Sequence, residues 1–348
     1  MSYITFNNIE IPGITVCVPT EKVCNRELKE FTKEEIEKFI KVTGVEYRRI
    51  AAKEVTTLDL GYRASLDLIE GLKLEKEEID AIIFVSQTPD YILPASAIIL
   101  QDKLGLPKST LAFDVSLGCS GYVYGLFIAA SLVQNGTLKN VLLVSGDTVS
   151  KTISPKDKTM AMLFGDACSA TLIRKGTSDI YFSLNSDGGG KDHLIIKDGG
   201  FRNPMTMSSF ETYMWEDDNE RADCHLYMNG LEIFNFTLRE VIQDAKNLFN
   251  ESGISKDDIS YFVYHQANKF MNSYISKYLK LKEESTPESL LEYGNTSSAS
   301  IPLTICSKLT VEELVGKRIL LSGFGVGLSW GHCIIDEPKL TYLNLLEL

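Results

Sequence analysis

The segment Ile79-Asp80-Ala81-Ile82-Ile83-Phe84-Val85 has a counterpart 180 positions later, Ile259-Ser260-Tyr261-Phe262-Val263-Tyr264, and each follows two acidic residues. Both are typical of short buried strands. A second pair, Val141-Leu142-Leu143-Val144-Ser145-Gly146 and Ile319-Leu320-Leu321-Ser322-Gly323, has its final glycines 177 positions apart. Because two separate segments give nearly the same offset, we predict an internal duplication, of a period too long for a solenoid. The alternative is a chance likeness between short apolar strands.

The regions between these strands predict helices. Strand-like and helix-like stretches alternate along the whole chain, which indicates an α/β fold. Pro94 to Gly105 has proline at its start and glycine at its end, as helices do. The apolar stretch from Gly121 to about Gln134 is a second predicted helix, and the turn from Glu292 to Ser300 lies at the matching point of the second half. We therefore expect two related halves, with any chemistry between them.

Composition excludes several classes of protein. The 348 residues are 44% hydrophobic and 24% charged, which is ordinary for a globular protein. With 35 Lys and Arg against 47 Asp and Glu the net charge is −12, and this acidity argues against nucleic-acid binding. No secretory signal is evident, and no apolar stretch approaches the roughly 20 residues that cross a bilayer. We expect a cytoplasmic chain without a membrane partner. Seven cysteines without a Cys-x-x-Cys pair indicate neither a disulfide framework nor a zinc site.

Cys119 is the candidate nucleophile. It lies where a predicted strand ends and the apolar helix from Gly121 begins. The amides and the positive dipole end of a helix N-terminus favour a thiolate over a thiol. Glycines at positions 118 and 121 indicate a tight turn with close backbone approach. The competing interpretation is a small hydrophobic residue that fills core space.

His265 and Asn295 are the candidate partners of that thiol. His265 ends the predicted strand Tyr261 to Tyr264, where its side chain can face a cleft. Asn295 stands in a Gly-Asn-Thr-Ser-Ser turn, although asparagine also serves turns structurally. Taken singly, each residue fits a structural role. Together with Cys119 they supply a thiolate, an imidazole and a neutral amide donor, all at strand ends or turns.

Several longer motifs occur in order along the chain. They are Thr43-Gly44-Val45-Glu46-Tyr47-Arg48-Arg49-Ile50, Asp114-Val115-Ser116-Leu117-Gly118-Cys119-Ser120-Gly121, Phe164-Gly165-Asp166, His265-Gln266-Ala267-Asn268, Gly294-Asn295-Thr296-Ser297-Ser298-Ala299-Ser300 and Gly323-Phe324-Gly325-Val326-Gly327-Leu328-Ser329-Trp330-Gly331. On these motifs the chain resembles, nearly end to end, the β-ketoacyl-acyl-carrier-protein synthase III family of condensing enzymes. The resemblance implies a homodimer and a thiolase-like duplicated five-layer αβαβα fold. Residues 1–175 would be the half that carries the nucleophilic cysteine, and residues 176–348 the half that carries the histidine and asparagine.

The resemblance also implies a mechanism with Cys119, His265 and Asn295 as a catalytic triad. Cys119 would accept an acyl group from a thioester, and the backbone N–H groups of Cys119 and Val326 would hold the oxyanion. Decarboxylation of a malonyl thioester would give an enolate stabilised by His265 and Asn295, and its carbanion would attack the acyl group. This chemistry requires no metal or redox cofactor. The implied partners are acyl-carrier protein and thioesters carried on it or on coenzyme A, in fatty acid synthesis or a specialised pathway.

Some positions depart from the family pattern. Lys38 and Lys158 stand where the family clamps the adenine of coenzyme A between Trp and Arg, which disfavours a primer borne on coenzyme A. Phe270 replaces a usual Arg, but Lys269 precedes it. We expect Asn268, Lys269 and Lys158 to bind the carrier or its pantetheine arm. Further lysines that would extend a basic surface are Lys277, Lys280 and Lys282. An ordinary solvated helix face is an equal alternative.

Leu93 stands where the family places a bulky aromatic that closes the primer pocket from the neighbouring subunit. A leucine there would admit a longer or branched acyl chain, although it would also serve simple packing. The segment from Lys191 to Cys224 is expected to be an irregular excursion that covers the site.

Two other functions stay open from the sequence. One keeps the triad but transfers the acyl group to an oxygen or nitrogen nucleophile without decarboxylation. The other is a non-catalytic partner subunit of a condensing heterodimer, which the presence of all three triad residues disfavours.

Overall fold

A ten-stranded mixed sheet runs through this computed structural model, which describes residues 2–348, without the side chain of residue 2. Its order is β13-β14-β15-β8-β1-β7-β6-β4-β5, and β16 pairs with β1. The strands are β1 (Ser2–Val18), β4 (Ala81–Val85), β5 (Leu111–Val115), β6 (Asn140–Asp147), β7 (Ala167–Lys175), β8 (Ser178–Ser186), β13 (Tyr261–Tyr264), β14 (Arg318–Gly325), β15 (Ser329–Asp336) and β16 (Tyr342–Glu347).

The two halves of this sheet have the same pairing. In the N-terminal half β4 is parallel to β6, and β6 is antiparallel to β7. In the C-terminal half β13 is parallel to β14, and β14 is antiparallel to β15. The strands whose sequences resemble each other therefore occupy equivalent places. The division at residues 175 and 176 falls at the end of β7 and stays a prediction.

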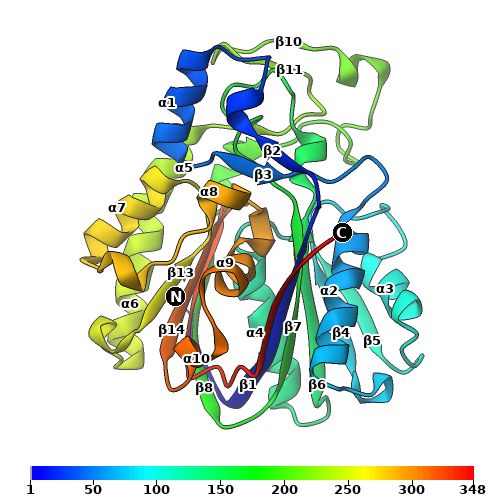
Figure 1. Cartoon of the computed structure of the whole chain (residues 1–348), viewed down its shortest axis with the longest axis vertical. Coiled ribbons are helices and arrows are strands. Elements are labelled where there is room, and N and C mark those ends of the chain that lie inside the picture. Colours follow the sequence, from blue (N-terminus) through cyan, green and yellow to red (C-terminus); the bar gives the residue numbers. More distant parts are fainter. Residues whose placement is uncertain (1) are drawn as a thin grey trace.

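Helices form layers on both sides of the sheet halves (Figure 1). α4 (Gly121–Gln134) and α9 (Ser300–Lys308) lie between the halves, because each contacts strands of both. α2 (Thr57–Gly71) and α3 (Ser96–Leu104) cover the outer face of the N-terminal strands. α6 (Ile242–Ser252) and α7 (Lys269–Leu279) pack outside the C-terminal strands. The result is the five-layer αβαβα arrangement that the family resemblance implied.

The middle layer explains the apolar sequence of α4. Tyr122, Leu126, Ala129 and Val133 all belong to one core cluster that also includes α9 residues and strands of both halves. A helix covered on every side is apolar all round, which is the pattern from Gly121 onward. The buried helix thus holds the preceding residue, Ser120, and the cysteine before it at the centre of the molecule.

Short elements complete the chain. They are β2 (Lys22–Cys24), β3 (Tyr47–Arg49), β9 (Leu194–Ile195), β10 (Tyr213–Met214), β11 (Glu220–Arg221), β12 (Tyr227–Met228), α1 (Lys33–Thr43), α5 (Gly230–Phe236), α8 (Leu290–Tyr293) and α10 (Val311–Leu314). The predicted excursion from Lys191 to Cys224 has only short strands and turns. It is anchored by Arg221, which is fully buried and forms ion pairs with Asp157 and Asp217.

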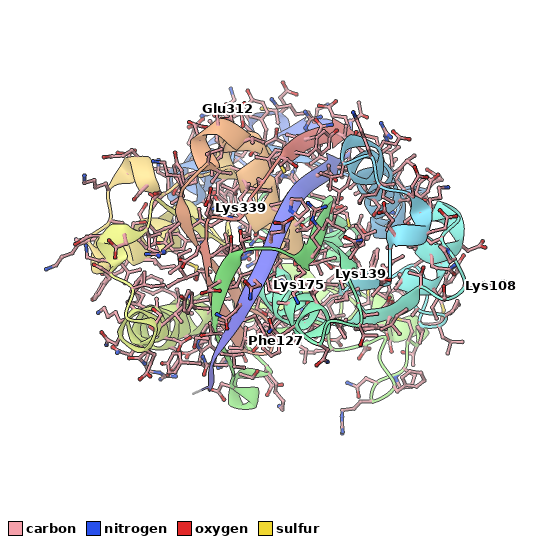
Figure 2. The ribbon with its side chains drawn as sticks, turned by 90° about the horizontal axis from the view of Figure 1, so that it is seen from below. Lys108, Phe127, Lys139, Lys175, Glu312 and Lys339 are labelled. Carbon is pink, nitrogen blue, oxygen red and sulfur yellow. The ribbon has the colours of Figure 1, made fainter. Side chains whose placement is uncertain are left out.

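The end of the molecule seen from below carries charged side chains. Lys108, Lys139, Lys175 and Glu312 are exposed there (Figure 2). Within residues 2–348, no helix is long and apolar enough to span a membrane.

Candidate active site

Cys119 lies in the turn between β5 and α4 and is 8% exposed. Two glycines let neighbouring backbone pack against this turn. A Cβ atom on Gly118 would lie 2.4 Å from Gln87 Oε1 and 2.9 Å from Val326 Cγ1. A Cβ atom on Gly325 would lie 2.7 Å from the Cβ of Cys119. Gly118 and Gly325 therefore allow the neighbouring backbone and side chains to pack closely around the thiol.

His265 directly follows β13 and is buried beside Asn295. Its backbone N–H donates to Ser322 O at 2.7 Å, which continues the pairing with β14. Its Nδ1 lies 2.7 Å from Ser300 Oγ on the first turn of α9, and its Nε2 lies 3.5 Å from Asn295 Nδ2. The edge of the imidazole faces Phe324, with ring centroids 5.5 Å apart. The ring is therefore held from three sides.

Asn295 is fixed by the Phe-Gly-Asp motif. Its backbone N–H donates to Leu163 O at 2.9 Å, and its carbonyl accepts from Gly165 N at 3.0 Å. Its side-chain Oδ1 accepts from Ser297 N at 2.9 Å. The Asn295 carboxamide therefore has its oxygen occupied, and its Nδ2 is directed toward His265.

Two hollows meet at the thiol. Cys119, His265 and Asn295 line the first, a cavity of about 60 Å³ that also includes Asn268 and Met271. The second, of similar volume, is lined by Cys119 together with Gln87, Thr88, Asp147, Val149, Thr152, Ile196, Leu226, Ser297 and Val326. Phe164 and Leu194 border both hollows. The structure thus brings the three predicted residues together around the first hollow. The second hollow borders the same sulfur atom but is not lined by His265 or Asn295.

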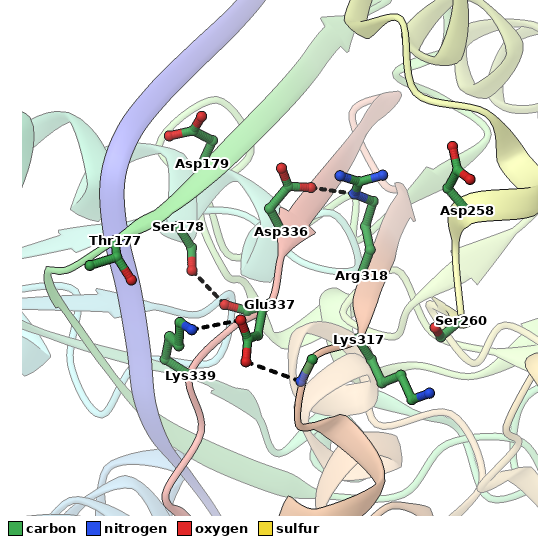
Figure 3. Close-up of a pocket in the computed structure, with 11 residues that line it drawn as sticks. Thr177, Ser178, Asp179, Asp258, Ser260, Lys317, Arg318, Asp336, Glu337 and Lys339 are labelled. Carbon is green, nitrogen blue, oxygen red and sulfur yellow. Dashed lines mark hydrogen bonds and ion pairs between the residues drawn. The ribbon is translucent and has the colours of Figure 1, made fainter.

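A larger hollow of about 580 Å³ lies at the opposite ends of the same strands (Figure 3). Four of its charged groups pair with each other: Arg318 with Asp336, and Lys339 with Glu337. Neither a cysteine nor a histidine lines it. It offers no group for thiol chemistry.

The thiol of Cys119 is not the thiolate that its place at a helix N-terminus suggested. Burial raises the pKa of Cys119 to about 12, and the negative charge of Asp147 acts in the same direction. Ser297 and the backbone N–H groups of Cys119 and Val326 bind the sulfur and lower the pKa, but by less. Desolvation therefore outweighs the helix terminus. Both predicted oxyanion donors, Cys119 N–H and Val326 N–H, face the sulfur.

His265 is a neutral imidazole. Burial lowers the pKa of His265 to about 3, and no acidic side chain offsets this. One ring nitrogen therefore carries a proton at neutral pH and the other accepts a hydrogen bond. If the Ser300 hydroxyl donates to Nδ1, the ring proton lies on Nε2, beside Asn295.

This neutral state predicts how stability depends on pH. The unfolded chain binds a proton at His265 below pH 6.5, but the folded chain does so only near pH 3. The free energy of unfolding should therefore fall as pH decreases between these values, by about 1.4 kcal/mol per pH unit from this group alone. Urea unfolding of wild type and a His265→Gln variant at pH 7 to 4 checks this. The variant should show the weaker pH dependence, and an equal dependence would contradict a buried neutral imidazole.

The other predicted residues lie at varying distances from the thiol. Asn268 lines the first hollow and caps α7, since its Oδ1 accepts from Met271 N at 2.9 Å. Lys269 is exposed and its Cβ packs against Gly44. Lys158 pairs with Glu35 on α1 at 3.1 Å. Leu93 is 77% exposed and lines neither hollow in the single chain.

Three polar residues at the site were not assigned roles from the sequence. Ser297 and Ser300 belong to the motif that contains Asn295, and they contact Cys119 and His265 respectively. Asp147 is a fully buried carboxylate at the end of the apolar strand β6. The sequence feature that could have identified Asp147 is an acidic residue at the end of a buried apolar strand. Among residues 2–348, no group of three or more His, Cys, Asp or Glu side chains could hold a metal ion.

Comparisons with known proteins identify the family. The family model described as 3-oxoacyl-[acyl-carrier-protein (ACP)] synthase III matches residues 113–188, and the model of its C-terminal part matches residues 249–336. A β-ketoacyl-[acyl-carrier-protein] synthase III of Clostridium acetobutylicum is 34% identical over 96% of this chain and 100% of its own length. The crystal structure of a 3-oxoacyl-(acyl-carrier protein) synthase from Burkholderia xenovorans covers the whole chain, and 99% of its own, at 38% identity and a TM-score of 0.93. A synthase III from Pseudomonas aeruginosa, at 28% identity, covers 95% of this chain and 99% of its own with a TM-score of 0.80.

A duplicated five-layer fold, with a cysteine, a histidine and an asparagine around one cavity, defines the class of thiolase-fold condensing enzymes. Within that class, the chain belongs to the 3-oxoacyl-[acyl-carrier-protein] synthase III family. It is therefore an acyltransferase of the condensing type, and the family, fold and function expected from the sequence are confirmed. The two open alternatives, acyl transfer without decarboxylation and a non-catalytic subunit, are not favoured.

Proposed function

We propose that the enzyme loads an acyl group onto Cys119 and condenses it with a malonyl thioester. One observation carries this assignment of roles: Cys119, His265 and Asn295 line the same cavity, with His265 Nε2 and Asn295 Nδ2 3.5 Å apart. The nucleophile and two neutral nitrogen donors thus surround a single reaction space. The names of the relatives, which are 3-oxoacyl or β-ketoacyl synthases, agree with this chemistry.

Acyl transfer is the first step. The Cys119 sulfur attacks the thioester carbonyl, and the developing oxyanion accepts hydrogen bonds from the N–H groups of Cys119 and Val326. Both already point at the sulfur, so they need little rearrangement. The carrier thiol leaves with the proton that Cys119 gives up. The second hollow, with Thr88, Val149 and Leu226, is then the space for the acyl chain.

Condensation is the second step. The malonyl group loses carbon dioxide, and the resulting enolate oxygen accepts hydrogen bonds from His265 Nε2–H and Asn295 Nδ2–H. A neutral imidazole suits this role, because its proton stays in place while negative charge develops on the oxygen. The carbanion attacks the acyl carbonyl, and Cys119 leaves as a thiolate that takes up a proton. Neither step changes an overall oxidation state, so no redox cofactor is needed.

Intact-mass analysis tests both steps. Enzyme incubated with acyl thioesters on coenzyme A or acyl-carrier protein should gain one acyl mass, located on Cys119 by peptide mapping. Addition of malonyl-carrier should release carbon dioxide and give a 3-oxoacyl product two carbons longer. Acyl transfer to an oxygen or nitrogen nucleophile, without carbon dioxide, would contradict the proposal.

We also propose that an acyl-carrier protein docks on α7, in the cytoplasm. This helix begins beside Asn268, at the hollow that contains the triad. Exposed lysines lie on it or just beyond its end: Lys269, Lys277, Lys280 and Lys282. Such a surface complements an acidic carrier. Lys158 is less suited to this role than the sequence suggested, because it already pairs with Glu35.

Charge reversal of this surface should weaken recognition of the carrier and leave the chemical step unchanged. Lys277→Glu combined with Lys280→Glu should lower kcat/KM for malonyl-carrier by about 10-fold, mainly through KM. The rate with malonyl-N-acetylcysteamine, which has no carrier, should not change. Lys139→Glu, at an exposed lysine that lies on neither α7 nor the edge strand β5, is the matched control (Figure 2). Equal losses with both substrates would show that the lysines do not dock the carrier.

A homodimer through β5 is the third part of the proposal. β5 pairs with β4 on one side only, so its other edge is unpaired among the described residues. The nearby loop exposes Tyr91, Ile92 and Leu93 by 61%, 77% and 77%. Pairing of two β5 edges would cover these side chains. Leu93 would then reach the acyl space of the partner.

Leu93 should set the accepted chain length if this dimer forms. Leu93→Phe should lower kcat/KM for longer or branched acyl donors by about 10-fold relative to acetyl donors, because the larger ring shortens the acyl space. Competition between donors of two lengths measures this ratio. Sedimentation should show a dimer for wild type and variant. A monomer, or an unchanged preference, would place Leu93 outside the acyl space.

A further inference from the structure

The hydroxyl of Ser300 is hydrogen-bonded to the imidazole of His265. Ser300 Oγ lies 2.7 Å from His265 Nδ1, the distance of a well-formed hydrogen bond. Both residues are buried, with exposed fractions of 1% and 2%. Ser300 is the first residue of α9, so the hydroxyl is carried by a helix of the central layer. The side of the imidazole that faces away from Asn295 is therefore held by a rigid element.

The direction of this hydrogen bond follows from the surroundings of Ser300. A hydroxyl has one proton to donate, and a buried proton without an acceptor costs free energy. Within residues 2–348, the side-chain oxygen of Ser300 has one hydrogen-bond partner, His265 Nδ1. The Ser297 carbonyl, which also faces the imidazole, already accepts from Ser300 N. We conclude that the hydroxyl donates to Nδ1, because the opposite direction would leave its proton without an acceptor.

The start of α9 favours the same arrangement. The N-terminus of a helix carries partial positive charge, so a nitrogen that faces it is better unprotonated than protonated. The nitrogen of His265 that is bonded to the first turn of α9 is Nδ1. A neutral imidazole carries one proton, which then lies on the other nitrogen, Nε2. The hydroxyl and the helix terminus thus select the same tautomer.

This tautomer decides whether His265 and Asn295 are open to a substrate. Asn295 Nδ2 lies 3.5 Å from His265 Nε2 and 3.4 Å from Ala267 O. With a proton on Nε2, two donors face each other without bonding, and both can bind one oxygen atom in the cavity. With the proton on Nδ1, Nε2 would accept a hydrogen bond from Asn295 Nδ2. The two groups would then satisfy each other, and an enolate would lose a donor.

We propose that Ser300 is a positioning residue that holds His265 in the tautomer protonated at Nε2. The inference rests on the proposed function and deepens its second step. Ser300 lines neither hollow at the thiol, so it acts through His265 and not on the substrate. Its hydroxyl donates to Nδ1, and Nε2–H donates to the enolate oxygen that forms from the malonyl group. No proton is transferred, and the imidazole is neutral before and after condensation.

Three variants separate this role from a structural one. Ser300→Ala removes the donor to Nδ1, whereas Ser300→Thr keeps a hydroxyl at the same position. Ser307→Ala is the matched control, because Ser307 lies on the same helix and its hydroxyl donates to the backbone, to Leu303 O at 2.7 Å. The rates measured are single-turnover acylation of Cys119 by acyl-N-acetylcysteamine and steady-state condensation with malonyl-carrier.

Nitrogen NMR of enzyme with isotope-labelled histidine measures the tautomer itself, because protonated and unprotonated ring nitrogens give distinct signals. The chain has four histidines, and a spectrum of His265→Gln identifies the signals of His265. Wild type, Ser300→Thr and Ser307→Ala should show a His265 proton on Nε2. In Ser300→Ala a second form protonated at Nδ1 should appear, since Asn295 Nδ2 can then donate to Nε2.

Condensation by Ser300→Ala should be about 30-fold slower than wild type, because part of the enzyme lacks one donor to the enolate. Acylation of Cys119 should stay within about 3-fold of wild type, since its oxyanion donors are backbone N–H groups. Ser300→Thr should recover condensation to within about 5-fold of wild type, and Ser307→Ala should behave like wild type. Slow condensation with normal acylation and a changed tautomer is the expected signature.

Several outcomes would overturn this role of Ser300. They are a wild-type His265 protonated at Nδ1, a Ser300→Ala variant with the wild-type tautomer or the wild-type condensation rate, and equal losses of acylation and condensation. If Ser300→Ala does not fold, Ser300→Cys replaces it, because a thiol of similar size is a weak donor. A wild-type enzyme that shows the Nε2 tautomer but condenses no thioester would instead overturn the proposed function.

Discussion

A Cys119→Ala enzyme should form no acyl adduct but should still decarboxylate a malonyl thioester. Of the seven cysteines, Cys119 lines both hollows, and none of the other six lines either of them. Loss of its sulfur removes the acceptor for the acyl group. Condensation should fall by at least about 10⁴-fold, the scale seen when a covalent nucleophile is deleted. The donors to the enolate, His265 and Asn295, are unchanged, so carbon dioxide should still be released.

Two assays on one sample check this expectation. Intact mass after incubation with an acyl donor should show no added acyl group, while release of labelled carbon dioxide from malonyl-carrier continues. Cys224→Ala, at a partly buried cysteine of the excursion, should behave like wild type in both. An acyl adduct on the Cys119→Ala protein would mean that another side chain is the nucleophile. Loss of both activities would mean that decarboxylation depends on the sulfur.

The internal duplication explains why the site forms where it does. Cys119 and Ser297 are 178 positions apart, an offset that lies between those of the repeated strands. Cys119 lies two residues before α4 and Ser297 three residues before α9, the two helices of the middle layer. Equivalent turns of the two halves therefore meet at the centre of the molecule, and one supplies the nucleophile while the other supplies the hydroxyl beside it. The repeated strands already predicted this meeting of the halves from the sequence.

The electrostatics of the site could not be predicted in the same way. A helix N-terminus lowers a thiol pKa only when its effect exceeds that of desolvation, and neither burial nor the approach of Asp147 is visible in the motif around Cys119. Lys158 is a similar case, because its partner Glu35 comes from α1, which is distant in the sequence. Residue types and motif order predicted that Cys119, His265 and Asn295 lie together, but tertiary packing sets the charge states of Cys119 and His265.

An Asn295→Asp variant should still be acylated at Cys119 but should condense poorly, whereas a Cys119→Ala variant loses acylation. Aspartate keeps an oxygen for the bond from Ser297 N, now 2.9 Å from Asn295 Oδ1, so the turn should survive. It replaces the amide donor by a carboxylate 3.5 Å from His265 Nε2, which raises the pKa of the imidazole and repels the enolate. Acylation of Cys119 should stay within about 3-fold of wild type, since its donors are backbone N–H groups, while condensation should fall by about 100- to 1000-fold. Single-turnover acylation and steady-state product formation measure the two rates, with Asn250→Asp, an exposed asparagine on α6, as the control. A variant that condenses at the wild-type rate would show that the carboxamide does not stabilise the enolate.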